Sequence, residues 1–159
     1  MSEKIAVIGL GNTLRRDDGI GIIILESLLK FYKRKDIDYL NFGSASFDLL
    51  HRLKTYDAVL FIDGINAGFG FGELKISKLR DIEYKLDNFV SSTHEINLRN
   101  IFELSKILGI KTKIYVAGIQ VEDTSFGEGL SEALKHKKEN IIKEIITFIE
   151  KTFSWCRKV

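Results

Sequence analysis

Three aspartates and one histidine have the types and the spacing to carry out chemistry. Asp17 and Asp18 follow a glycine-rich turn after the first apolar run, and Asp63 follows the third such run. His94 lies shortly before a later apolar segment. Carboxylate oxygens combined with an imidazole nitrogen suit a borderline divalent ion such as nickel or zinc better than magnesium or calcium. These side chains predict a metal-related site if the fold brings them together.

The aspartates also have ordinary structural explanations. Asp is a favoured N-cap residue whose charge suits the positive end of a helix, so Asp17 or Asp18 could cap the helix that follows. One aspartate is enough for that role, and the second is left over. Asp63 precedes Gly64 and could form a turn there. A metal-related site at these aspartates has to be weighed against helix capping and turn formation.

His94 lies in a Ser-Thr-His-Glu segment that has the S-x-x-E spacing of a capping box. Ser92 would then cap a helix, Glu95 would reach back to it, and His94 would project from the first helical turn. The zinc-protease motif H-E-x-x-H is not formed, because Leu98 occupies the position of the second histidine. The histidine is therefore a candidate ligand only together with the aspartates.

Other motifs are incomplete. Gly9 and Gly11 begin a dinucleotide-binding pattern, but Leu14 replaces its third glycine and Asn41 occupies the place of a ribose-binding acid. Two carboxylates beside this turn would repel a phosphate. The sequence contains no G-x-S-x-G elbow, and it marks no serine as paired with a histidine. A nucleotide site and a nucleophilic serine are both disfavoured.

The composition limits the class of protein. The 159 residues include 24 Lys and Arg against 22 Asp and Glu, a formal net charge of +2, so the charge predicts no nucleic acid or membrane partner. No apolar stretch approaches the roughly 20 residues that span a bilayer, and the first residues do not resemble a signal peptide. The single cysteine, Cys156, excludes an intrachain disulfide and fits a reducing cytoplasm. We expect one cytoplasmic domain over residues 1–159.

Apolar periodicity predicts the elements that must position the candidate side chains. The expected strands are 5–10, 39–42, 56–62, 73–79 and 113–121, and the expected helices are 20–31, 49–53, 98–108 and 131–153. Their order predicts a three-layer α/β/α sandwich with a mostly parallel five-stranded sheet, in which 73–79 is the one antiparallel edge strand. Ligands of such sheets bind beyond the carboxyl ends of the strands, where Asp18 and Asp63 are expected.

Residues 8–21, with the sequence IGLGNTLRRDDGIG, resemble the N-terminal signature of the NiFe-hydrogenase maturation endopeptidases. Later segments resemble further motifs of that family in the same order, at 61–64, at 92–94, and at 118–120 followed by 127–131. The likeness covers essentially the whole chain. Four ordered matches are more specific than any one of them alone.

The resemblance implies an endopeptidase that removes the C-terminal extension of a hydrogenase large-subunit precursor after nickel has been inserted. The family's metal ligands fall on Asp18, Asp63 and His94, which would also be the catalytic residues of an aspartic-type peptidase. Asp17 could orient them. Nickel would arrive with the substrate, and other divalent ions could substitute in the empty site. The precursor would be the partner, and the enzyme is expected to be a monomer.

Two positions depart from the family pattern. Asn41 replaces an acidic residue at the end of the second strand, and Val121 replaces a proline after the last one. The second change leaves the three expected ligands untouched.

Two other function classes remain open from the residues alone. The same acids could form a non-enzymatic nickel- or nucleotide-binding α/β module. They could also serve a magnesium-dependent enzyme that handles phosphate groups. That second class is weakened because Arg15 and Arg16 are the only cations near the loop.

Overall fold

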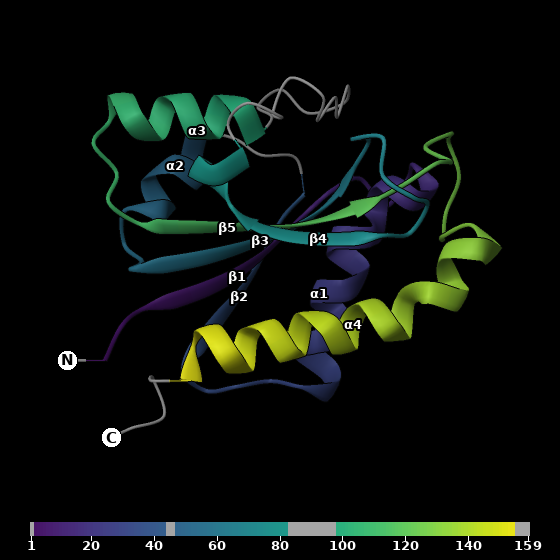
Figure 1. Ribbon diagram of the computed structural model, residues 1–159, viewed down its shortest axis with the longest axis horizontal. Helices are drawn as coiled ribbons and strands as arrows, with labels where there is room; N and C mark the ends of the chain where they lie inside the picture. The colour runs from purple at the N-terminus through teal and green to yellow at the C-terminus, as the bar shows by residue number, and fades with distance from the viewer. Residues whose placement is uncertain (1, 44–46, 83–97, 155–159) are drawn as a thin grey trace.

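The computed structural model describes residues 2–43, 47–82 and 98–154, which form a five-stranded sheet with helices on both faces (Figure 1). The strands are β1 Ile5–Leu10, β2 Ile37–Gly43, β3 Ala58–Ile65, β4 Leu74–Lys78 and β5 Lys113–Gln120. The helices are α1 Ile20–Phe31, α2 Phe47–Leu53, α3 Leu98–Ile107 and α4 Glu132–Thr152, and the 3-10 turn η1 spans Arg16–Gly19. Within these described ranges, no helix is long and apolar enough to cross a membrane.

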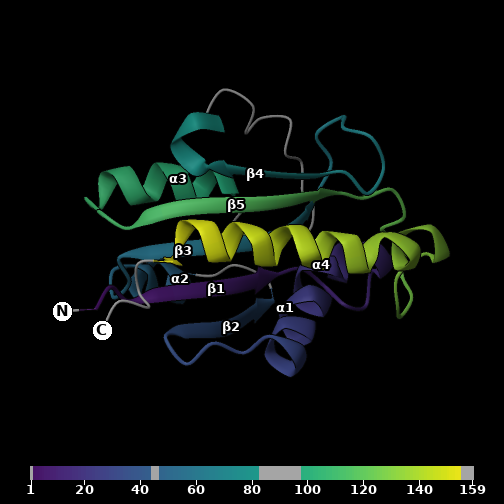
Figure 2. The same ribbon diagram turned by 60° about the horizontal axis from the view of Figure 1, so that its bottom comes forward.

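The sheet has the strand order β2-β1-β3-β5-β4. The first four of these strands are parallel to one another, and β4 at the edge is antiparallel to β5. Helices α1 and α4 cover one face and α2 and α3 the other, and α4 lies lengthwise along its face (Figure 2). The predicted α/β/α sandwich with one antiparallel edge strand is confirmed.

Strand β1 shows why the inner strands are apolar throughout. Successive side chains of a strand point to opposite faces of the sheet. Ile5 and Val7 therefore pack in the core under α1 and α4, while Ala6 and Ile8 pack in the core under α2 and α3. Because both faces are covered, no position of this strand can carry an exposed polar side chain.

Strand β3 is longer than its sequence predicts. We expected it to end at Ile62, with a turn at Asp63, but the ladder with β5 continues to Ile65. Asp63 lies inside the strand and pairs with Gly118. The interpretation of Asp63 as a turn residue is wrong, because β5 offers hydrogen-bonding partners to the three residues beyond Ile62. The carboxylate is thereby carried by a strand paired with β5 rather than by a loop.

The connections that follow the neighbouring strands β1 and β3 run to opposite sides of the sheet. After β1 the chain continues to β2 on one side, and after β3 it continues to β4 and β5 on the other. Such a switch point is where open α/β sheets bind ligands, beyond the carboxyl ends of the strands. Helix α1 begins against this point. A methyl group added at Gly21 would lie 2.2 Å from the carbonyl oxygen of Ile62 and 2.3 Å from that of Leu10.

Candidate functional site

Asp18 lies in η1, the turn between β1 and α1, and it is 4 % exposed. Its Oδ2 accepts a hydrogen bond of 3.0 Å from the backbone N–H of Asn12. A phosphate at this glycine-rich turn would need such backbone donors, and this one is already taken by a carboxylate. The geometry therefore argues against a dinucleotide site and places an acidic group at the end of β1.

Asp63 is 2 % exposed, and its Oδ1 has no hydrogen-bond partner among the described residues. Burial raises the pKa of this carboxyl well above its usual value, and the negative charge of Asp18 raises it further, while the backbone N–H of Gly64 acts in the opposite direction. The two aspartates, one from η1 and the other from β3, thus interact electrostatically.

This pair of carboxylates is equipped for proton transfer or for contact with a cation. Two like charges in a buried place are costly to ionise together, so Asp63, whose pKa is raised, tends to keep its proton. A buried carboxylate oxygen without a donor needs an explanation, and a ligand that supplies a proton or a metal would provide one. Asp18 and Asp63 were both predicted from the sequence, and the fold brings them to the same end of the sheet.

Asp17 has a different role from its neighbour. Its Oδ1 accepts a hydrogen bond of 2.7 Å from the backbone N–H of Ser131, and its Oδ2 accepts one of 3.0 Å from the hydroxyl of Ser131. Ser131 is the N-cap residue of α4. Asp17 is fully buried, and it therefore ties the Asp18 turn to the start of the last helix.

The expected capping of α1 by an aspartate is not observed. The N-cap residue of α1 is Gly19, and no side chain makes a cap hydrogen bond there. Asp17 instead faces Ser131, and Asp18 bonds back to Asn12. This correction removes capping of α1 as the explanation for either aspartate.

His94 lies outside the described residues, and so does the capping box formed by Ser92 and Glu95. Its predicted position beside the two aspartates is therefore an expectation from the sequence. Within residues 2–43, 47–82 and 98–154, no three His, Cys, Asp or Glu side chains gather in a way that could hold a metal ion.

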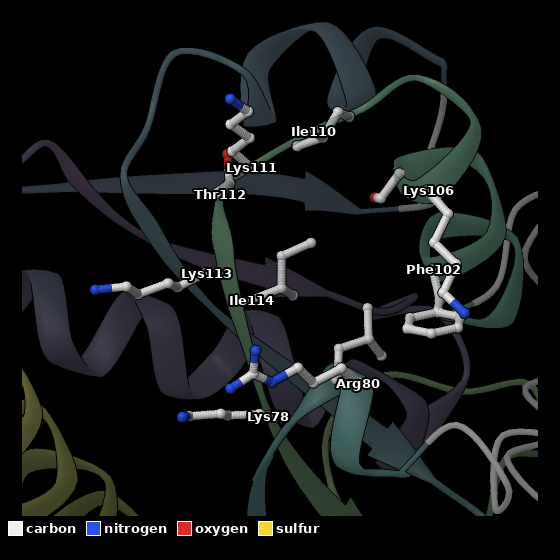
Figure 3. A pocket seen from close by; sticks show the side chains of 11 residues that line it. Lys78, Arg80, Phe102, Lys106, Ile110, Lys111, Thr112, Lys113 and Ile114 are labelled. Atoms are coloured by element: carbon white, nitrogen blue, oxygen red, sulfur yellow. The ribbon is translucent and has the colours of Figure 1, made fainter.

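A cavity of about 350 Å³ lies at the opposite end of the sheet, where α3 ends and β5 begins (Figure 3). Its floor is apolar, with Phe102 and Ile114 among the lining residues. The basic residues around it are Lys78, Arg80, Lys106, Lys111 and Lys113. Among the described residues that line this cavity there is no carboxylate, so it does not include the acidic pair.

Comparison with known proteins decides the family. A family model described as hydrogenase maturation protease (HycI) matches residues 22–148, which is most of the chain. The chain belongs to this family. Membership of this family makes the chain a peptidase. Neither the non-enzymatic binding module nor the phosphate-handling enzyme is retained.

Individual relatives agree with this assignment. The hydrogenase 2 maturation protease of Escherichia coli is 24% identical over 155 residues, which span 94% of this chain and 92% of that protein. The crystal structure of the NiFe-hydrogenase maturation protease HycI from Thermococcus kodakarensis has a TM-score of 0.74 at 28% identity, with 94% of each chain covered. The E. coli endopeptidase HybD has the same fold, with a TM-score of 0.82 at 22% identity over 94% and 93% of the two chains.

Sequence reasoning missed how the protease supports its acidic pair. The loop 121–131 holds the Asp18 turn through Asp123 and Ser131, whose backbone groups bond to Asp17. A signal was present in Gly127 and Gly129, which have φ angles of 150° and 81°. Glycines so close together mark a loop with a fixed and unusual path, although they do not say what it contacts.

We expect Asp63→Asn to stabilise the metal-free protease in a pH-dependent way. The pKa of Asp63 is raised in the folded state above the unfolded value of 3.8, so its contribution favours folding at low pH and is lost as the pH rises toward the folded pKa. Asparagine does not ionise. The variant should exceed the wild type in free energy of unfolding by about 1–3 kcal/mol at pH 8.

Urea denaturation from pH 5 to pH 8, with a chelator present, measures this difference. The advantage of the variant should shrink as the pH falls. An advantage that stays constant across this range would show that the carboxylate charge is not its cause.

Proposed function

We propose that this protease removes the C-terminal extension of a NiFe-hydrogenase large-subunit precursor after nickel insertion, and that it recognises the nickel. In this proposal Asp18, Asp63 and His94 contact a nickel ion that the substrate carries. The observation that carries the proposal is the buried Asp63, with one oxygen unpartnered among the described residues, beside Asp18 at the switch point of the sheet. Hydrolysis of a peptide bond needs a group of this kind, which can take up or give a proton beside the bond that is cut.

The two aspartates supply the proton transfers of an aspartic-type peptidase. Water attacks the carbonyl carbon of the scissile peptide, a C–O bond forms, and the C–N bond breaks. One proton of the water passes to an ionised carboxylate of the pair, and the leaving nitrogen takes up a proton. Because the pKa of Asp63 is raised, the pair can hold the proton that the leaving amine needs.

The nickel belongs to the substrate in this scheme rather than to the free enzyme. Carboxylate oxygens and an imidazole nitrogen suit nickel, and a metal held next to the scissile bond fixes the position of that bond. Other divalent ions could bind the same side chains in the empty enzyme. We propose that the enzyme is monomeric and cytoplasmic, which agrees with its single cysteine and its small net charge.

The direct test is incubation of the protease with nickel-loaded and nickel-free large-subunit precursor, followed by intact mass measurement. We expect a C-terminal peptide to be lost only from the nickel-loaded form. Equal cutting of both forms would overturn the nickel recognition and leave the peptidase activity. Absence of cutting in both would overturn the assignment of this precursor as substrate.

A further inference from the structure

Two large apolar side chains are exposed on the loops that flank the acidic pair. Leu14 is 58 % exposed in the turn after β1, and Phe126 is 82 % exposed in the loop between β5 and α4. These two loops lie at the right of the view in Figure 1, beyond the carboxyl ends of the strands. Asp18 follows Leu14 by four residues in the same turn. The exposed apolar groups therefore lie on the turn that carries Asp18 and on the loop that is bonded to this turn.

The backbone holds these two loops together. The carbonyl oxygen of Leu14 accepts a hydrogen bond of 2.9 Å from the N–H of Gly127, and the N–H of Arg16 donates one of 3.0 Å to the carbonyl oxygen of Gly127. The Nε of Arg15 donates a further bond of 3.0 Å to the carbonyl oxygen of Thr124. Leu14 and Phe126 are thus carried on one framework, which fixes them relative to Asp18.

Two further features show that this framework has a defined shape. The guanidinium of Arg15 lies 5.4 Å from the centre of the Phe126 ring, which orients the ring through a cation–π contact. Arg16 has a φ angle of 42°, in the left-handed region that residues other than glycine seldom adopt. Strained backbone of this kind is typical of functional loops.

We propose that Leu14 and Phe126, here called the apolar rim, bind apolar side chains of the large-subunit precursor next to its cleavage site. This inference rests on the proposed function. Leu14 lies in the turn that carries Asp18, and the loop with Phe126 is bonded to that turn, so a peptide bound at Asp18 would have the rim within reach. Large apolar side chains that are held exposed beside a site are typical of protein recognition, where an aromatic residue often supplies much of the affinity.

The test compares Leu14→Ser and Phe126→Ser with Phe31→Ser. Phe31 is 78 % exposed and also lies under a cation, with the Nζ of Lys30 5.1 Å from its ring centre. Phe31 is the last residue of the 12-residue α1. It lies about 18 Å from the first residue of that helix, which is the end near the carboxyl ends of the strands. The control therefore removes the same kind of side chain from a distant place.

We expect each rim variant to raise KM for the nickel-loaded precursor about tenfold and to leave kcat within about twofold, whereas Phe31→Ser changes neither. Calorimetry of the binding of uncut precursor to each variant should show the same loss of affinity. All three side chains are exposed, so thermal melting should confirm that the variants fold.

Several outcomes would overturn the inference. KM and affinity could be unchanged in both rim variants, or changed equally by Phe31→Ser. Wild-type protein could bind phosphatidylglycerol vesicles and lose that binding in Phe126→Ser, which would assign the rim to a membrane. Sedimentation could show a dimer that Phe126→Ser dissociates, which would assign it to a second copy. Failure of the proposed function has a different sign: in that case the wild type itself does not cut nickel-loaded precursor.

Discussion

Asp63→Asn and Asp18→Asn should each slow the cutting of nickel-loaded precursor by about 10³-fold or more, because each removes one half of the pair that we propose moves the proton. Asparagine keeps the shape of the side chain but can neither accept the proton of the attacking water nor return it to the leaving amine. A carboxylate that contacts nickel also loses its charge. The measurement is a single-turnover time course, with the cut and uncut masses quantified.

Asp81→Asn is the matched control for these two variants. Asp81 is exposed and pairs only loosely with Arg80, at 3.8 Å between Oδ1 and Nε. An exposed pair of this kind contributes little to stability, and we expect its loss to leave the rate unchanged. A rate within tenfold of wild type in Asp63→Asn would remove this residue from the catalytic machinery. Circular dichroism of each variant separates loss of chemistry from loss of fold.

Gly21→Ala should destabilise the protein by about 3 kcal/mol or more, which is a severe loss for one added methyl group. The new carbon would lie 2.2 Å and 2.3 Å from the carbonyl oxygens of Ile62 and Leu10. Both obstacles are backbone atoms of inner strands, so no side-chain rotation relieves the overlap. Helix α1 would have to move away from β1 and β3, and the η1 turn that carries Asp18 would move with it.

Urea denaturation measures this loss, and Gly70→Ala is its control. The added carbon at Gly70 would meet only the Oε2 of Glu73, at an ordinary 3.4 Å. Surface changes of this kind usually alter stability by less than about 0.5 kcal/mol. If Gly21→Ala were as mild as the control, the close approach of α1 to the strand ends would not be required by the fold.

Much of the fold could be predicted because apolar periodicity depends only on which faces are buried. The helix expected at 20–31 has those bounds in the structure, and β1 has the expected 5–10. Strand β2 begins two residues earlier than expected, at Ile37. The end of β3 could not be predicted, since Asp63 and Gly64 are poor strand formers alone and become strand residues through their partners on β5.

The candidate site was predictable in part for the same reason. Asp18 and Asp63 follow apolar runs, and the carboxyl ends of parallel strands meet at one edge of a sheet. The partner of Asp17 could not be inferred, because Ser131 is 114 residues away in sequence. Only the folded chain shows that Asp17 bonds to the start of α4, while the charge of Asp18 acts on Asp63. The position of His94 stays a prediction from the sequence.

The bond between Asp17 and Ser131 also sets an order of events while the chain is being made. The ribosome delivers β1 and the Asp18 turn early, but the loop that fixes this turn leaves the exit tunnel only after β5, and α4 follows it. Until then the N–H groups of Arg16 and Asp17 lack the carbonyl acceptors of Gly127 and Asp123. A nascent chain therefore carries both aspartates before the contacts that fix the Asp18 turn can form.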